Sequence, residues 1–115
     1  MAETRRLLVI DDEENMRHML QSVLGRLGYA VRTAANGREG LAALAAEPFD
    51  TVLCDIRMPE MDGLAFLRRA GEQGVAATII MMSAYGTTDT ALQAMQLGAY
   101  DYISKPFKLD EIELT

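Results

Sequence analysis

Short apolar segments alternate with segments of helical periodicity along the whole chain, and this alternation restricts the fold more than any other feature. The apolar segments are too short for buried helices and match strands that are covered on both faces of a sheet. The predicted strands are residues 7–10, 29–33, 51–54, 77–82 and 100–103. The predicted helices are residues 16–27, 37–46, 64–70, 87–97 and 107–115. Five strand–helix alternations predict an α/β domain with a parallel sheet and helices on both faces.

The first predicted helix illustrates the pattern. Its apolar residues recur at helical spacing and form one stripe, made of Met16, Leu20, Val23, Leu24 and Leu27. Gly28 is expected to end this helix and Gly98 the fourth, because glycine readily adopts the left-handed conformation that follows a helix.

Composition excludes several classes of protein. The chain has 115 residues, a net charge of −6, one Cys and one His, so a disulfide framework or a Cys/His metal cluster is impossible within it. The acidic balance argues against direct binding of nucleic acid. No apolar run is long enough to span a membrane, and the first residues do not form a signal peptide. We expect a single cytoplasmic domain over residues 1–115.

Polar residues follow the predicted strands, where each strand ends. Asp11 and Asp12 follow the first strand, Asp55 the third, Ser83 the fourth and Lys105 the fifth. The carboxyl ends of parallel strands form the ligand crevice of open α/β sheets, at the point where strand order reverses. Each residue alone has an ordinary explanation, such as a helix cap for the paired acids or a solvated surface lysine. Their common location predicts a functional site.

The residue types indicate the chemistry of that site. In a sheet of order 2-1-3-4-5 the first and third strands are neighbours, so Asp11, Asp12 and Asp55 would converge and repel one another. A hard divalent cation relieves this repulsion, and oxygen ligands favour Mg²⁺. A carboxylate beside Mg²⁺ is a competent nucleophile toward phosphorus. Lys105 and the Ser83 hydroxyl would then neutralise or bind the remaining phosphoryl oxygens.

These residues also carry a resemblance to a known family. The combination resembles the receiver domain of two-component response regulators, and its motifs are Asp11-Asp12, Asp55, Met58-Pro59, Asp62-Gly63, Ser83-Ala84 and Lys105-Pro106-Phe107. The resemblance implies a flavodoxin-like, doubly wound, five-stranded parallel sheet of order 2-1-3-4-5.

The resemblance also implies a role for each site residue. Asp55 would be the phosphoacceptor and, with Asp12 and the main-chain carbonyl of Arg57, a direct ligand of Mg²⁺. Asp11 would act mainly through water. Ser83 and Lys105 match the hydroxyl and the lysine that assist phosphorylation, and Tyr102 matches the aromatic residue that turns inward when the hydroxyl moves.

Residues 83–87, Ala94-Met95, 98–102 and 105–107 resemble one subfamily, the nitrogen-regulatory (NtrC-like, sigma-54 activator) type. Receivers of this type precede an ATPase module and a DNA-binding domain. The implied function is a phosphorylation-dependent switch that takes its phosphoryl group from a sensor histidine kinase and controls such an effector. The domain would not be an enzyme, although it assists its own phosphorylation and dephosphorylation. A homodimer could form through helix 4, strand 5 and helix 5, and the last helix is expected to be cut short.

Three other functions share parts of this pattern. An aspartyl-phosphate hydrolase of haloacid-dehalogenase type needs a second Asp two residues after the nucleophile, where this chain has Arg57. A flavin or nucleotide binder needs a Gly-rich phosphate loop after the first strand, where this chain has the acidic run 11–14. A Mg²⁺-binding docking module that is never phosphorylated stays open, although it leaves Ser83 and Lys105 without a task.

Overall fold

The computed structural model describes residues 5–56, 61–83 and 88–104. The strands of this part are β1 (Arg6–Ile10), β2 (Ala30–Ala34), β3 (Thr51–Asp55), β4 (Thr78–Ser83) and β5 (Asp101–Ser104). The helices are α1 (Glu14–Arg26), α2 (Gly37–Ala46), α3 (Gly63–Glu72) and α4 (Thr88–Gln96). The predicted helix at 107–115 lies outside the described residues. The strands pair in parallel and form a sheet of order β2-β1-β3-β4-β5.

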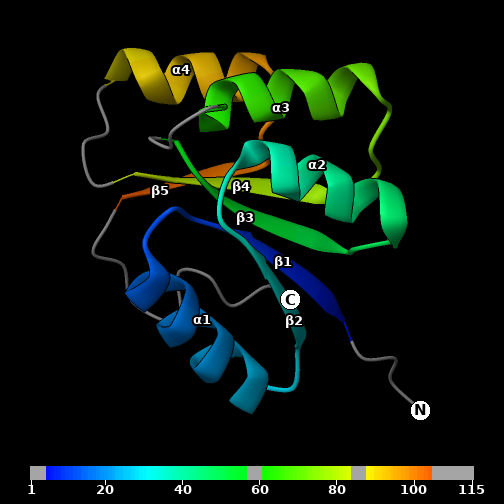
Figure 1. The fold of residues 1–115 in the computed structure, drawn as a ribbon. Helices are drawn as coiled ribbons and strands as arrows, with labels where there is room; N and C mark the ends of the chain where they lie inside the picture. Colours follow the sequence, from blue (N-terminus) through cyan, green and yellow to red (C-terminus); the bar gives the residue numbers. More distant parts are fainter. Residues whose placement is uncertain (1–4, 57–60, 84–87, 105–115) are drawn as a thin grey trace.

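Helices cover both faces of this sheet, with α1 on one face and α2, α3 and α4 on the other (Figure 1). The predicted α/β architecture is therefore confirmed. Two apolar clusters fill the two layers, and alternate residues of one strand enter different clusters. In β1, Leu7 and Val9 pack in the layer of α1, whereas Leu8 and Ile10 pack in the layer of α2 and α3. This alternation explains why the central strands are apolar at nearly every position.

The edge strand β2 has a different pattern, because its exposed and partly buried residues alternate before the buried Ala34. β2 is therefore more exposed than the central strands β1 and β3, as expected for a strand with one unpaired side.

Local signals fix several helix ends. The Asn36 and Asp62 side chains cap α2 and α3 by accepting the N–H groups of Glu39 and Ala65 at 2.9 and 2.8 Å. Gly28 and Gly98 follow α1 and α4 with φ of 102° and 103°, so both predicted helix ends are confirmed.

The predicted stripe of α1 needs one correction. Leu20 and Leu24 are buried and Met16 and Val23 are half-buried, but Leu27 is 51 % exposed. Leu27 is the residue that caps the C-terminal end of the helix, where the chain turns toward Gly28, and its side chain no longer faces the sheet.

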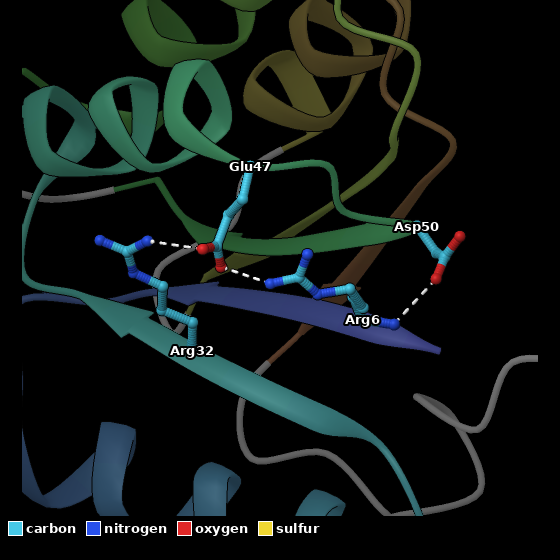
Figure 2. Close-up of polar contacts among 4 residues, drawn as sticks. All are labelled: Arg6, Arg32, Glu47 and Asp50. Atoms are coloured by element: carbon cyan, nitrogen blue, oxygen red, sulfur yellow. Dashed lines mark hydrogen bonds and ion pairs between the residues drawn. The ribbon is translucent and has the colours of Figure 1, made fainter. Parts of the chain in front are cut away.

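The end of the sheet opposite the carboxyl edge is held by polar contacts (Figure 2). Glu47 is the residue that follows α2. Its carboxylate accepts a hydrogen bond from the Arg6 guanidinium of β1 at 2.6 Å and lies 3.3 Å from the Arg32 guanidinium of β2. The main-chain N–H of Arg6 donates to the Asp50 carboxylate at 2.8 Å. These contacts fasten the segment between α2 and β3 to the first two strands. In the described part of the chain, no helix has the length and apolarity needed to cross a bilayer.

Candidate functional site

Three carboxylates meet at the carboxyl edge of the sheet, above the neighbouring strands β1 and β3. One oxygen from each of Asp11, Asp12 and Asp55 lies within 4.8 Å of the others. Asp11 is fully buried, Asp55 is 7 % exposed and Asp12 is exposed. The expected convergence of these three residues is confirmed, and it follows from the pairing of β1 with β3.

Hydrogen bonds to its N–H, its carboxylate and its carbonyl hold Asp11 in place. Its main-chain N–H donates to the carbonyl of Ala34, the last residue of β2, at 3.1 Å. Its carboxylate accepts the N–H of Glu13 at 3.0 Å, and its carbonyl accepts from the Arg17 guanidinium at 2.7 Å. The capping explanation of Asp11 is therefore partly right, because its side chain does satisfy an N–H at the start of α1.

Asp55 is the last residue of β3, and the turn that follows it is clamped from two sides. The N–H of Ile56 donates to the Met82 carbonyl at 3.0 Å, and the N–H of Gly63 donates to the Ile56 carbonyl at 2.7 Å. A Cβ on Gly63 would lie 2.7 Å from Ile56 Cα and in still closer contact with the Asp55 carbonyl oxygen. Only glycine lets the start of α3 approach the Asp55 turn this closely.

The donor set fits a hard divalent cation. All three groups are carboxylates, two of them are buried, and buried charges are usually paired or bound to metal ions. Cys54 lies beside this cluster, and its thiol donates to the Asp55 carbonyl at 3.3 Å. Burial raises the pKa of that thiol well above its ordinary value, and the negative charges of Asp55, Asp11 and Asp62 raise it further. Cys54 is a free, buried cysteine.

The remaining predicted site residues are described only in part. Ser83 is the last residue of β4, one position beyond Met82, which pairs with Asp55 across the sheet. Tyr102 lies in β5, pairs with Met81, and packs half-buried against the cluster under α2, α3 and α4. Arg57 and Lys105 lie outside the described residues.

Two residues that hold the site, Gly63 and Arg17, have no individual role in the site predicted from the sequence. Gly63 enters the sequence analysis only within the Asp62-Gly63 motif, with no role of its own, although a glycine in the first turn of a helix is a poor helix former and can mark a close approach. Arg17 carries no comparable signal, because an arginine on a surface helix is common.

The geometry and the comparisons agree on the class of protein. Residues 7–115 match the family described as the response regulator receiver domain. The chain belongs to this family, whose members are the phosphorylation-dependent switches of two-component systems.

Its relatives include transcriptional regulators. The chain is 42 % identical to the regulatory protein AtoC of Escherichia coli over 99 % of its own length and 25 % of that protein. It is 44 % identical to the DNA-binding transcriptional regulator NtrC of Salmonella typhimurium over 90 % of its length and 22 % of that protein. The chain thus spans about a quarter of these curated relatives. The resemblance to the sigma-54 activator type is confirmed.

A solved structure adds a chemical parallel. A response regulator from Burkholderia pseudomallei, determined with a phosphorylated aspartic acid, calcium ion and citrate, superimposes with a TM-score of 0.88 at 34 % identity. The match covers 94 % of this chain and 64 % of that chain.

Proposed function

We propose that residues 1–115 form one receiver domain that accepts a phosphoryl group on Asp55 from a sensor histidine kinase, with Mg²⁺ held at the acidic cluster. Asp12, Asp55 and the carbonyl of Arg57 would be its direct ligands, and Asp11 would bind through water. The cation would neutralise the negative charge on the phosphoryl oxygens. The convergence of three carboxylates within 4.8 Å carries this proposal, because it puts a cation site beside a possible nucleophile.

Phosphoryl transfer mainly requires that the protein position the reacting groups and neutralise their charge. A carboxylate oxygen of Asp55 forms the new P–O bond while the P–N bond of the kinase phosphohistidine breaks, and the electron pair of that bond returns to the imidazole nitrogen. Lys105 and the Ser83 hydroxyl would bind the other phosphoryl oxygens. The clamped turn around Asp55 limits its freedom, and fixed geometry is what phosphoryl transfer mainly requires. The same groups would assist hydrolysis of the phosphorylated state.

The output is proposed to be a change in the α4–β5 surface. Leu92 and Met95 of α4 are 55 % and 47 % exposed, and Tyr100, just before β5, is 67 % exposed. These apolar residues support a contact with a partner, either a second receiver or an effector. Phosphorylation at Asp55 would bias this surface between two states, with Ser83 and Tyr102 as the linking residues.

The relatives support the identity of that effector. Both are about four times as long as this chain; one is named a regulatory protein and the other a DNA-binding transcriptional regulator. We infer a cytoplasmic protein in which this receiver controls an ATPase module and a DNA-binding domain, without itself contacting DNA.

Intact-mass spectrometry tests the central step. The chain is incubated with acetyl phosphate and Mg²⁺, and a gain of one phosphoryl group is expected. Asp55→Asn and a chelator should each abolish the gain. Asp50→Asn is the matched control, since Asp50 precedes the opposite end of the same strand and is exposed, so this variant should be phosphorylated normally.

Two outcomes would contradict the proposal. An adduct that persists in Asp55→Asn would move the acceptor to another residue. Failure of the parent chain to gain a phosphoryl group, together with Mg²⁺ binding but no response to beryllofluoride, would favour the docking module that is never phosphorylated.

A further inference from the structure

Arg17 makes a contact that links α1 to the acidic cluster. Its side chain is half-buried, and its guanidinium donates to the main-chain carbonyl of Asp11 at 2.7 Å. This distance is typical of a strong hydrogen bond from a charged donor. The contact reaches six residues back along the chain, so it joins the first turn of α1 to the residue that follows β1.

The carbonyl that Arg17 holds belongs to the peptide group between Asp11 and Asp12. Because a peptide group is planar, fixing its oxygen fixes the orientation of the whole unit. That orientation sets the last main-chain dihedral of Asp11 and the first of Asp12. It therefore determines how the two carboxylates are aimed relative to each other.

Two other hydrogen bonds of Asp11 hold different parts of the residue. The bond to Ala34 holds the main-chain N–H on the preceding side of the residue, and the bond to Glu13 holds the carboxylate. Asp12 is exposed, so close packing does not hold its side chain. Among the hydrogen bonds of the described residues, the Arg17 contact is thus well suited to keep Asp12 directed toward Asp11 and Asp55.

We propose that Arg17 is a positioning residue for the cation site, one that raises Mg²⁺ affinity by holding the Asp11–Asp12 peptide. The inference rests on the proposed function, because it assumes that the cluster binds Mg²⁺. Groups that hydrogen-bond to metal ligands without contacting the metal typically raise metal affinity tenfold or more. Arginine suits this task, since its rigid fork of donors holds a fixed geometry that a lysine does not.

The charge of Arg17 has the opposite effect. A guanidinium near the cluster repels a cation, so removal of the charge alone would tighten Mg²⁺ binding. The two effects are separable, because they predict changes of opposite sign.

The test measures the Mg²⁺ dissociation constant of the unphosphorylated chain by isothermal titration calorimetry. Arg17→Met, which removes the donor and the charge, should weaken binding roughly tenfold. Arg17→Lys keeps the charge but loses the fork, and it should still weaken binding about threefold, a part of the effect of the full loss. Arg26→Met is the matched control, because Arg26 is an exposed residue of the same helix that contacts Ser22 instead. It should bind Mg²⁺ as the parent does.

Circular dichroism establishes that each variant is folded before titration, and Arg17→Lys decides the matter if Arg17→Met does not fold. Binding by Arg17→Lys equal to that of the parent, or tighter binding by folded Arg17→Met, would overturn the positioning role while leaving the proposed function intact. Absence of Mg²⁺ binding by the parent chain would overturn both.

Discussion

Gly63 should not tolerate a methyl group, and the cost can be worked out from its surroundings. The Cβ of an alanine at this position would lie 2.7 Å from both Ile56 Cα and Met81 Cε and would press on the Asp55 carbonyl oxygen. Two of these three atoms belong to the main chain and cannot move aside independently. Forcing an extra methyl group into a filled site costs about 1–3 kcal/mol. The higher helix propensity of alanine offsets at most about 1 kcal/mol of this cost. We expect Gly63→Ala to lower the free energy of unfolding by roughly 1–2 kcal/mol.

The same helix offers a control of opposite sign. Gly71 also lies in α3, is exposed, and has no atom within 4 Å of the position that a Cβ would occupy. Gly71→Ala should stabilise the chain by about 0.4–1 kcal/mol, because it reduces the conformational entropy of the unfolded state. An identical chemical change in one helix therefore has two different signs, and the contact with the Asp55 turn is the reason for the difference.

Urea denaturation followed by far-ultraviolet circular dichroism measures both effects. With a denaturant dependence of about 1–3 kcal/mol per molar urea, the expected shifts in midpoint are on the order of 0.5–1 M. A Gly63→Ala midpoint equal to or above that of the parent would refute the reasoning. Such a result would mean that the Asp55 turn can move away at little cost and is not clamped by α3.

Three further outcomes are expected. Phe66→Ala should lower the free energy of unfolding by about 3–5 kcal/mol in the same assay, since Phe66 is fully buried; a loss below about 1 kcal/mol would contradict this. Burial and the charge of Asp55 raise the pKa of Cys54 above the ordinary 9.0, so the unfolded chain releases this proton first as pH rises. Stability should therefore fall above that pH by at most about 1.4 kcal/mol per pH unit, and Cys54→Ala should remove this part of the slope. Glu47→Gln, which removes the charge between Arg6 and Arg32, should cost at most about 1 kcal/mol, with the loss shrinking at high salt; a salt-independent loss would argue against an ionic role.

Most of the fold could be predicted because local and tertiary requirements coincide. Strands buried on both faces must be apolar throughout, and that pattern is visible without knowledge of their neighbours. Helix ends with Gly28 and Gly98 follow from backbone conformation, which is a property of the residue itself. Leu27 was predicted wrongly because periodicity extends a stripe past the residue where the helix ends.

The site could be predicted only at the level of residue type. Acidic residues at strand ends indicated a cation site, and their convergence then depended on the pairing of β1 with β3. The role of Gly63 depends on how closely α3 approaches Asp55, and that of Arg17 on a contact between a side chain and a distant carbonyl. Such distances arise from tertiary packing and leave no pattern of spacing in the sequence.

The unequal burial of the two adjacent acids has a consequence for how the site would work. Asp11 and Asp55 are buried, and main-chain hydrogen bonds hold the segments that carry them. Asp12 is exposed to water. Mg²⁺ gives up its hydration water reluctantly and usually keeps several water ligands in proteins. A site with two buried carboxylates and one exposed carboxylate suits that behaviour, since the buried pair can hold the ion while water ligands remain on its exposed side. Because the three carboxylates repel one another before the ion binds, affinity depends on how firmly they are held together. The hydrogen bonds from Arg17, Glu13 and Gly63 are therefore as much a part of the proposed site as the acids themselves.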